Sequence, residues 1–320
     1  MAAVLALTNP HAQGGRLRRL APALAQAVAQ RAPQVEWALP ETVAEVLHLI
    51  HQLPPGSRVL AFGGDGAVNR WLPALLAGGH TLALVPMGSG NDLARALGLY
   101  GMAWTEALEC ALTSAEASMD VGEVVLREGS DTGPPDPLRP ASSAAQATRA
   151  VPFLSSLAVG FDASVGLRAL RGPGWLRGQP RYLWATLKEL AALRDWGLRI
   201  TVDGGPAWQG RVLLASTLNT RSYGSGMPAA PSARIDDGRM ELLRAAAMGR
   251  PGVLTLLPRL LRGTHLSDPR VSLQPFQTLQ VQAADPVPLA VDGEYLGEFT
   301  GFEVRVLPAA LRVVWASSAG

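Results

Sequence analysis

Short apolar runs alternate with helix-like stretches over the first 120 residues. The runs contain almost no polar positions, as expected of strands buried on both faces of a parallel sheet. They are residues 4–8, 35–39, 58–62 and 81–85. The stretches with apolar residues three and four apart are residues 16–31, 42–53 and 67–76, the second opened by a capping box of Thr42 and Glu45. This pattern predicts an α/β domain over residues 1–120, a parallel sheet with helices on both faces that binds ligands beyond the carboxyl ends of its strands.

The pattern changes at about residue 121 to short strands separated by Gly and Asp turns. Residues 128–150 are rich in Pro, Ser and Ala without periodicity, which predicts a long flexible loop. One helical stretch, at about 181–194, interrupts the strands. The strand-like runs are residues 198–202, 211–218, 239–243, 279–283, 288–291 and 302–306. Residues 121–320 are therefore predicted to form a second, mostly antiparallel β domain.

Composition narrows the function classes. The 320 residues carry 28 Lys plus Arg against 26 Asp plus Glu, so the net charge of +2 gives no support for nucleic-acid binding. Cys110, the single cysteine, excludes an internal disulfide and a cysteine-rich zinc site, which favours a reducing compartment. The start of the chain lacks a signal-like pattern, and no apolar run reaches about 18 residues. We therefore expect a cytoplasmic protein.

Lys188 is the single lysine, and it follows no glycine loop. A Walker-type phosphate loop and a protein kinase both need a lysine on the phosphates. Any nucleotide site in this chain must therefore work without that lysine.

Two glycine loops carry the candidate chemistry. The run at 58–62 leads into Gly63, Gly64, Asp65 and Gly66, and the run at 81–85 leads into a second loop, Gly88-Ser89-Gly90-Asn91-Asp92. Glycines at a strand-to-helix junction let backbone amides approach an anion, and an aspartate among them implies phosphate bound together with Mg²⁺. At neighbouring strand ends the two loops would face one cleft. The alternative is a pair of tight turns, with Asn91 or Asp92 as a helix N-cap.

The motifs resemble a known family. GGDGAVN at 63–69, GSGNDLAR at 88–95 and NPHAQGG at 9–15 are similar to the diacylglycerol kinase-type catalytic domain, shared by bacterial lipid kinases and by sphingosine and ceramide kinases. Later segments follow in the family order, so the resemblance covers nearly the whole chain. They are DVG at 120–122, GFDA at 160–163, ARIDDGRM at 233–240 and VDGE at 291–294. The resemblance implies an ATP-dependent, Mg²⁺-dependent lipid kinase whose second domain is a β-sandwich.

The resemblance also assigns roles to residues. Glu294 would be the base that takes the proton from the lipid hydroxyl, with Asp292 orienting it. Mg²⁺ would be organised by Asp65, Asp92 and Asp120, and a second, structural Mg²⁺ by Asp237 with the backbone carbonyls of Arg234 and Arg239. The ATP-binding residues would be Asn9, Pro10, His11, Ala12, Gln13, Gly63, Gly64, Asp65, Gly66, Ala67, Val68, Asn69, Arg70, Gly88, Ser89, Gly90 and Asn91.

Simpler interpretations stay open for two of these segments. Asp292-Gly293 is the dipeptide that two-residue hairpin turns favour, and a turn and a catalytic role are compatible. Asp237-Gly238 forms a turn without any ion. Some positions depart from the family. Ala67 and Arg70 stand where Thr and Glu are usual, Ser155 stands where Asn is usual, and Ser89 keeps the hydroxyl where Thr is frequent.

Residues 167–184 combine Arg168, Arg171, Arg177 and Arg181 with Trp175, Tyr182 and Trp184, and contain no acid. Arginines near anionic headgroups and aromatic rings at the interface favour membrane contact. We expect transient contact with a membrane surface there. The alternative is a solvated helix and loop whose Trp side chains pack into the second domain.

The leading prediction is therefore a lipid kinase acting on diacylglycerol or a similar membrane lipid, and the identity of the lipid stays open. A kinase of the same fold acting on a soluble hydroxyl compound, as NAD kinase does, is an alternative. A non-catalytic nucleotide- or lipid-binding regulator is another, motivated by Ala67 and Arg70. The oligomeric state is left open, a homodimer included.

Overall fold

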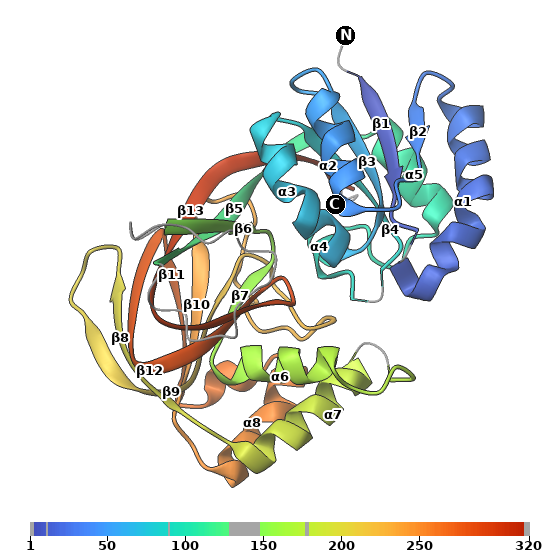
Figure 1. The fold of residues 1–320 in the computed structure, drawn as a ribbon. Helices are drawn as coiled ribbons and strands as arrows, with labels where there is room; N and C mark the ends of the chain where they lie inside the picture. Colours follow the sequence, from blue (N-terminus) through green and yellow to red (C-terminus); the bar gives the residue numbers. More distant parts are fainter. Residues whose placement is uncertain (1–2, 11, 89, 128–147, 177–178, 317–320) are drawn as a thin grey trace. The chain divides into compact units, whose positions relative to one another are not determined.

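The computed structural model describes residues 3–10, 12–88, 90–127, 148–176 and 179–316 (Figure 1). The chain divides into two compact units, Met1–Val121 with Pro308–Gly320, and Gly122–Leu307. The predicted division had left the last residues in the second domain. They belong to the first unit because the end of strand β13 (Glu294–Val314) returns there, with Arg312 and Val313 paired in parallel to Thr81 and Leu82. No helix in the described residues is long and apolar enough to cross a membrane.

The first unit is built on parallel strands. Strand β1 (Val4–Thr8) lies between β2 (Glu36–Ala38) and β3 (Arg58–Gly63), and β4 (Thr81–Pro86) pairs with the other edge of β3. These pairings are all parallel, so the carboxyl ends of β1, β3 and β4 meet at one edge. The loops that follow these strands are the predicted nucleotide loops.

Helices cover both faces of this sheet (Figure 1). Side chains of α1 (Ala12–Arg31) and α5 (Trp104–Thr113) pack with Leu60 and Val85 of one face. On the other side lie α2 (Val43–Gln52) and α3 (Asp65–Ala77), which contact each other. The predicted cap of α2 is confirmed, because Thr42 Oγ1 accepts a hydrogen bond from Glu45 N at 3.2 Å. A short helix, α4 (Asp92–Ala96), follows the second glycine loop.

The second unit is mostly antiparallel, as predicted. Its described pairings include β5 with β6, β7 with β9 and β12, β8 with β9 and β12, β9 with β10, β10 with β11, and β12 with β13. Buried side chains of its described strands and helices form a hydrophobic core. The strands not yet bounded are β5 (Glu116–Arg127), β6 (Thr148–Phe153), β7 (Ser156–Val159), β8 (Trp196–Val202), β9 (Trp208–Leu218), β10 (Met240–Ala246), β11 (Val271–Phe276) and β12 (Thr278–Val291).

The second unit contains more helices than the single one that the sequence predicted. The described residues form α6 (Phe161–Leu170), α7 (Gln179–Glu189) and α8 (Arg250–Leu261), with short 3₁₀ turns at Leu190–Ala192 and His265–Ser267. Helix α8 was not predicted because Pro251, Gly252 and Pro258 are residues that usually interrupt helices. Pro251 is tolerated because it lies in the first turn, where its missing amide hydrogen is not needed. Residues 148–150, assigned to the flexible loop, instead begin β6, while 128–147 lie outside the described residues.

Candidate active site

The two glycine loops lie against each other. Gly63 at the end of β3 pairs with Pro86 at the end of β4, and Met87 N donates to Gly63 O at 2.7 Å. A Cβ placed on Gly64 would lie 2.7 Å from Gly88 Cα, closer than real Cβ atoms approach backbone. The predicted adjacency of the loops is confirmed, and glycine is needed at both positions because the two backbones touch.

Asp65 of the first loop caps the helix that follows the second. Its Oδ2 accepts from Asp92 N at 2.9 Å and its Oδ1 from Leu93 N at 3.2 Å. Asn91 occupies the N-cap position in a left-handed conformation, but its side chain makes no capping bond. Asn91 therefore stands at the N-cap position of α4, as the alternative expected, but the side chain that bonds the first amides is that of Asp65 from the other loop.

Asn91 instead holds its own loop. Its Oδ1 accepts from Gly88 N and its Nδ2 donates to Gly88 O, each at 3.0 Å. These bonds of Asn91 and those of Asp65 fix the shape of the two loops through hydrogen bonds between side chains and backbone. Preorganised amides of this kind suit phosphate binding, since little ordering remains to be done when the anion arrives.

Adding a methyl group at Gly88 is expected to break this arrangement. A Cβ there would lie 2.5 Å from Asn91 Oδ1 and 2.7 Å from Gly64 Cα, so one loop must move. We expect Gly88→Ala to lower the free energy of unfolding by about 1–3 kcal/mol and to weaken ATP binding. Chemical denaturation and calorimetric titration with ATP measure both. Gly166→Ala is the control, because nothing lies within 4 Å of a Cβ there. Equal ATP affinity in Gly88→Ala and wild type would contradict the expectation.

The amino end of α3 lacks a side-chain cap. Gly64 at its N-cap provides no side-chain bond, and its carbonyl accepts from Ala67 N at 3.0 Å and Val68 N at 3.3 Å. A helix end without a side-chain cap offers its first amides and its dipole to an anion. The side chains of Ala67 and Val68 are buried, so these two predicted ATP-binding residues can contribute only backbone, whereas Arg70 is exposed.

The third predicted nucleotide segment begins where β1 ends. Asn9 N donates to Phe62 O at 3.4 Å, which holds this segment beside the end of β3. Thr8 just before it is fully buried, and its Oγ1 has no partner among the described residues. His11 and Ser89 lie outside the described residues, and the side chains of Ala12 and Gln13 are likewise not described.

Two of the three predicted Mg²⁺ carboxylates, Asp65 and Asp120, accept hydrogen bonds from backbone amides, and Asp92 lies 4.0 Å from Arg95. Asp120 is 2% exposed, and its Oδ1 accepts from Ala309 N at 2.8 Å, which fastens the returning end of β13. The part of the chain that the structure describes contains no group of three His, Cys, Asp or Glu residues able to hold a metal ion. A metal at this site would therefore depend on nucleotide phosphates and water for most of its ligands, as Mg²⁺ commonly does.

The segment proposed for a second ion forms a turn. Asp237 Oδ1 accepts from Arg239 N at 3.0 Å, and Gly238 follows with a positive φ of 73°. Asp236 pairs with Arg234 at 3.2 Å. The turn interpretation is confirmed, and the ion site made by Asp237 with the carbonyls of Arg234 and Arg239 stays a prediction.

The VDGE segment is a two-residue hairpin. Val291 at the end of β12 pairs with Glu294 at the start of β13. Asp292 and Gly293 between them both have positive φ, 45° and 88°, as a type I′ turn requires. The hairpin prediction is confirmed, and the turn presents Glu294 half-buried at the first position of β13.

Asp292 fastens this hairpin to another part of the unit. Its Oδ1 accepts from Ser155 N at 2.8 Å and Ser156 N at 2.9 Å, and its Oδ2 accepts from Leu154 N at 2.8 Å. Its own amide donates to Ser156 O at 2.9 Å. The prediction gave Asp292 the task of orienting Glu294. The structure shows its carboxylate bound to the backbone amides of Leu154, Ser155 and Ser156, and the orienting of Glu294 stays a prediction.

Two family models together match nearly all of this chain. The diacylglycerol kinase catalytic domain matches residues 3–124, and the YegS C-terminal NAD kinase beta sandwich-like domain matches residues 155–315. The chain belongs to the diacylglycerol kinase family of lipid kinases. The predicted resemblance is thereby confirmed, together with a β-sandwich-like second domain for this kinase.

Two related kinases align with this kinase over most of their length. It is 28% identical over 313 residues to the diacylglycerol kinase of Mycobacterium tuberculosis strain H37Rv, covering 97% of this chain and 94% of that protein. To the diacylglycerol kinase of Bacillus subtilis strain 168 it is 25% identical over 252 residues, 76% of this chain and 73% of that one.

Solved structures support the fold. A diacylglycerol kinase from Bacillus anthracis strain Sterne superimposes with a TM-score of 0.65 at 17% identity, covering 99% of this kinase and 98% of that chain. An NAD kinase from Archaeoglobus fulgidus in complex with ATP superimposes with a TM-score of 0.52 at 11% identity, covering 98% of this kinase and 94% of that chain. At these identities the likeness concerns the fold alone.

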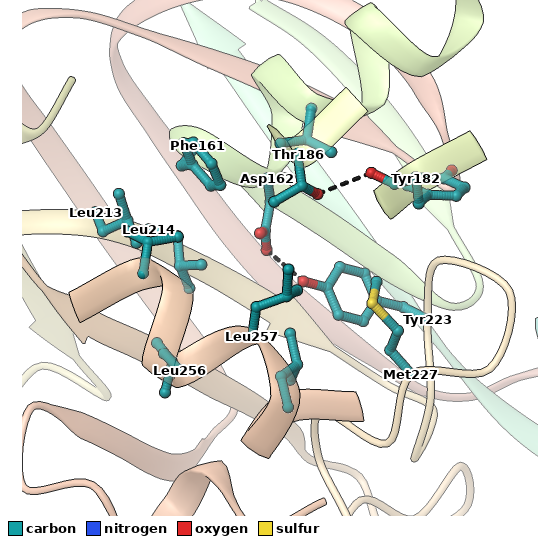
Figure 2. Close-up of a pocket in the computed structure, with 13 residues that line it drawn as sticks. Phe161, Asp162, Tyr182, Thr186, Leu213, Leu214, Tyr223, Met227, Leu256 and Leu257 are labelled. Atoms are coloured by element: carbon teal, nitrogen blue, oxygen red, sulfur yellow. Dashed lines mark hydrogen bonds between the residues drawn. The ribbon is translucent and has the colours of Figure 1, made fainter. Parts of the chain in front are cut away.

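Sequence reasoning missed one polar group of the kinase, Asp162 in the first turn of α6. Its Oδ2 accepts from Ser216 Oγ and from Tyr223 Oη, each at 2.8 Å, and it lines an apolar pocket (Figure 2). Burial raises the pKa of Asp162 to about 6, against the two hydroxyl donors, which lower it. The signal was present in the GFDA motif, but Ser216 and Tyr223 lie more than fifty positions away and no local pattern joins them to it.

Proposed function

We propose that this chain is an ATP-dependent kinase that phosphorylates the hydroxyl group of diacylglycerol or a similar membrane lipid, with Mg²⁺ accompanying the nucleotide. The observation that carries the proposal is the locked pair of glycine loops below the uncapped end of α3. These parts suit the phosphates of a nucleotide and contain no lysine, in keeping with the single lysine of the chain. Family membership supports the choice of acceptor.

Phosphoryl transfer needs positioned phosphates, neutralised charge and a base near the attacking hydroxyl. Backbone amides of the first turn of α3 would hold phosphate oxygens. Mg²⁺, when bound, would neutralise charge on the transferring group. Asp65 belongs to that turn, and its carboxylate also holds the loop geometry by accepting from the amides of Asp92 and Leu93.

Glu294 is the proposed base. As the lipid oxygen forms its bond to the γ-phosphorus, the bond from that phosphorus to the bridging oxygen breaks and ADP leaves. The hydroxyl proton passes to the Glu294 carboxylate. Asp292 contributes by fixing the hairpin that carries Glu294, through its three amide bonds.

The direct test is transfer of label from γ-labelled ATP to lipid acceptors by the purified chain. Vesicles containing diacylglycerol are compared with NAD as a soluble acceptor, with and without Mg²⁺. Labelled phosphatidic acid that depends on Mg²⁺ is the expected result. Label on NAD alone would replace the proposal with a soluble acceptor. ATP binding without transfer to any extracted lipid would replace it with a regulatory function.

Part of the segment 167–184 is free to meet a membrane, and we propose that it does so at the cytoplasmic surface. Trp175 is 80% exposed and Leu170 55% exposed, and Arg171 beside them is exposed as well. Other members have structural roles. Arg168 is paired with Glu189, and Arg181 donates to Gly172 O at 3.1 Å. Arg177 lies outside the described residues.

Trp184 also belongs to the packed part, because a Cβ on Gly172 would lie 2.8 Å from its ring. The alternative of packed tryptophans therefore holds for Trp184 and not for Trp175. The contact proposed for the membrane is accordingly the tip that contains Leu170, Arg171 and Trp175.

Replacing this tip is expected to weaken membrane binding. An arginine near an anionic surface contributes about 1 kcal/mol, so Arg171→Ala combined with Trp175→Ala should lower partitioning by at least about fivefold. Co-sedimentation with phosphatidylglycerol and phosphatidylcholine vesicles measures it. Arg199→Ala, at an exposed arginine on β8, is the control. Wild-type partitioning of the double variant would remove the membrane contact from this tip.

A further inference from the structure

A buried link of two residues, Leu154 and Ser155, joins β6 to β7, which begins at Ser156. The amides of these two residues and of Ser156 all donate to one carboxylate, that of Asp292. Asp292 N in turn donates to Ser156 O at 2.9 Å. The turn that leads into Glu294 is therefore fastened to residues 154–156 by four hydrogen bonds.

Asn219 holds the other side of the same link. Its Nδ2 donates to Leu154 O and its backbone amide donates to Ser155 O, each at 2.9 Å. Asn219 directly follows β9, whose last residue Leu218 pairs with Ser156, so the sheet brings Asn219 to this place. Its side chain is fully buried. Burial of an amide costs free energy unless hydrogen bonds offset it, and Asn219 meets that condition by bonding the link.

The turn itself lies beyond the strand pairing on either side of it. Strand β12 pairs with β7 as far as Val291 with Leu157, and with β13 as far as Val291 with Glu294. Asp292 and Gly293 then follow with positive φ. The position of these two residues depends on the bonds of Asp292 to residues 154–156. A shift of the link would therefore shift the turn, and with it Glu294.

We propose that Asn219 is a positioning residue for phosphoryl transfer. It fixes residues 154–156, these fix Asp292, and Asp292 fixes the turn that presents Glu294. The proposal rests on the proposed function, in which Glu294 takes the proton from the acceptor hydroxyl. Asn219 itself transfers no proton and acts through the intervening backbone. Displacing a reacting group by about 1 Å costs about 10²-fold in rate, so a small movement of the hairpin is measurable.

Removing the side-chain donor of Asn219 is expected to slow the chemical step. Asn219→Leu keeps the branching of the side chain without its polar atoms, and Asn219→Asp keeps its size, but an ionised carboxylate cannot donate to Leu154 O. We expect kcat with diacylglycerol vesicles to fall about 10–100-fold in both variants. The KM for ATP should not change, because the backbone amides proposed to hold the phosphates belong to the first unit.

The control for these variants is Thr217→Val, two positions earlier on β9. Thr217 is also fully buried, and its Oγ1 has no hydrogen-bond partner among the described residues, so kcat should stay at the wild-type level. A raised KM for ATP with wild-type kcat in Asn219→Leu would assign Asn219 to nucleotide binding and overturn the proposal.

A double-variant cycle tests the route through Asp292. Asp292→Asn already weakens the bonds to residues 154–156, so adding Asn219→Leu to it should lower kcat by less than about twofold more. Losses that multiply would show that Asn219 acts independently of the hairpin, which contradicts the proposal.

Amide hydrogen exchange tests the same contacts without any catalysis. It is read by mass spectrometry on peptides that cover residues 151–157 and 289–296. Asn219→Leu should speed exchange in both peptides by at least about fivefold. Val281→Ala is the control for a general loss of stability, since Val281 is buried in the far half of β12, paired with Ile200 and Phe302. It should speed exchange across the unit while kcat stays at the wild-type level.

Two results would overturn the proposal. One is exchange in the two peptides no faster in Asn219→Leu than in Val281→Ala. The other is wild-type kcat in Asn219→Leu although the two peptides exchange faster and Glu294→Gln abolishes turnover. If Glu294→Gln keeps its turnover, or the wild type transfers no phosphate, the proposed function falls instead, and exchange decides whether Asn219 holds the hairpin. Asn219→Ser, smaller and still polar, provides the same measurements if the leucine variant does not fold.

Discussion

Glu294→Gln is expected to lower the turnover of lipid phosphorylation by about 10²–10⁴-fold, the range associated with losing a general base. The glutamine keeps the size of the side chain and cannot accept the hydroxyl proton. Since Glu294 lies half-buried at the start of β13 rather than in the core, the free energy of unfolding should change by less than about 0.5 kcal/mol. Turnover is measured with saturating ATP and diacylglycerol vesicles, and stability by urea denaturation.

The control is Glu298→Gln, a half-buried glutamate four positions further along β13. It should retain wild-type turnover, which would show that the loss at Glu294 is specific to that carboxylate. If Glu294→Gln keeps more than about a tenth of the wild-type turnover, Glu294 is not the base.

Asp292→Ala is expected to lower the free energy of unfolding by about 3–5 kcal/mol, a loss that few single substitutions produce. Three backbone amides, of Leu154, Ser155 and Ser156, lose a charged acceptor at once. Alanine is also strained at the positive φ of 45° that the turn requires. Asp292→Asn tolerates that conformation better but keeps a single acceptor oxygen, so its loss should be intermediate.

Urea denaturation measures these losses of stability. The control is Asp285→Ala, at an exposed aspartate of β12, the strand that leads into the turn. The result also separates two roles. A positioning residue that acts through the fold should lose stability and turnover together. If Asp292→Asn has wild-type stability but greatly reduced turnover, Asp292 acts directly on Glu294 or on the substrate.

Much of the fold could be predicted because its signals are local. Strands buried on both faces leave apolar runs, and the starts of β1, β3 and β4 all coincide with such runs. Asp292-Gly293 has the composition of a two-residue turn and forms one. The adjacency of the glycine loops follows from neighbouring parallel strands, whose ends share an edge. In each case a few consecutive residues contain the physical constraint.

The failures concern interactions between distant residues. Composition showed an acid in each glycine loop but could not show that Asp65 caps a helix beginning 27 residues later. Nor could it show that the Asp292 carboxylate binds the amide of Leu154, 138 residues earlier in the chain. The return of β13 to the first unit was missed as well, because a pairing with Thr81 and Leu82, more than 200 residues earlier in the chain, leaves no local pattern.

The sequence by itself therefore determined the family, the order of the two units and the residues that carry the candidate chemistry. Each of these depends on residue types at fixed short spacing. The tertiary structure decided what the acids are bonded to. It brought Ser216 and Tyr223 within hydrogen-bond distance of Asp162, and Asp162 and Tyr223 line one apolar pocket. A carboxylate looks the same in sequence whether it awaits a metal or already accepts backbone amides. Its partners are set by chain segments far away, and only the folded chain brings them within hydrogen-bond distance.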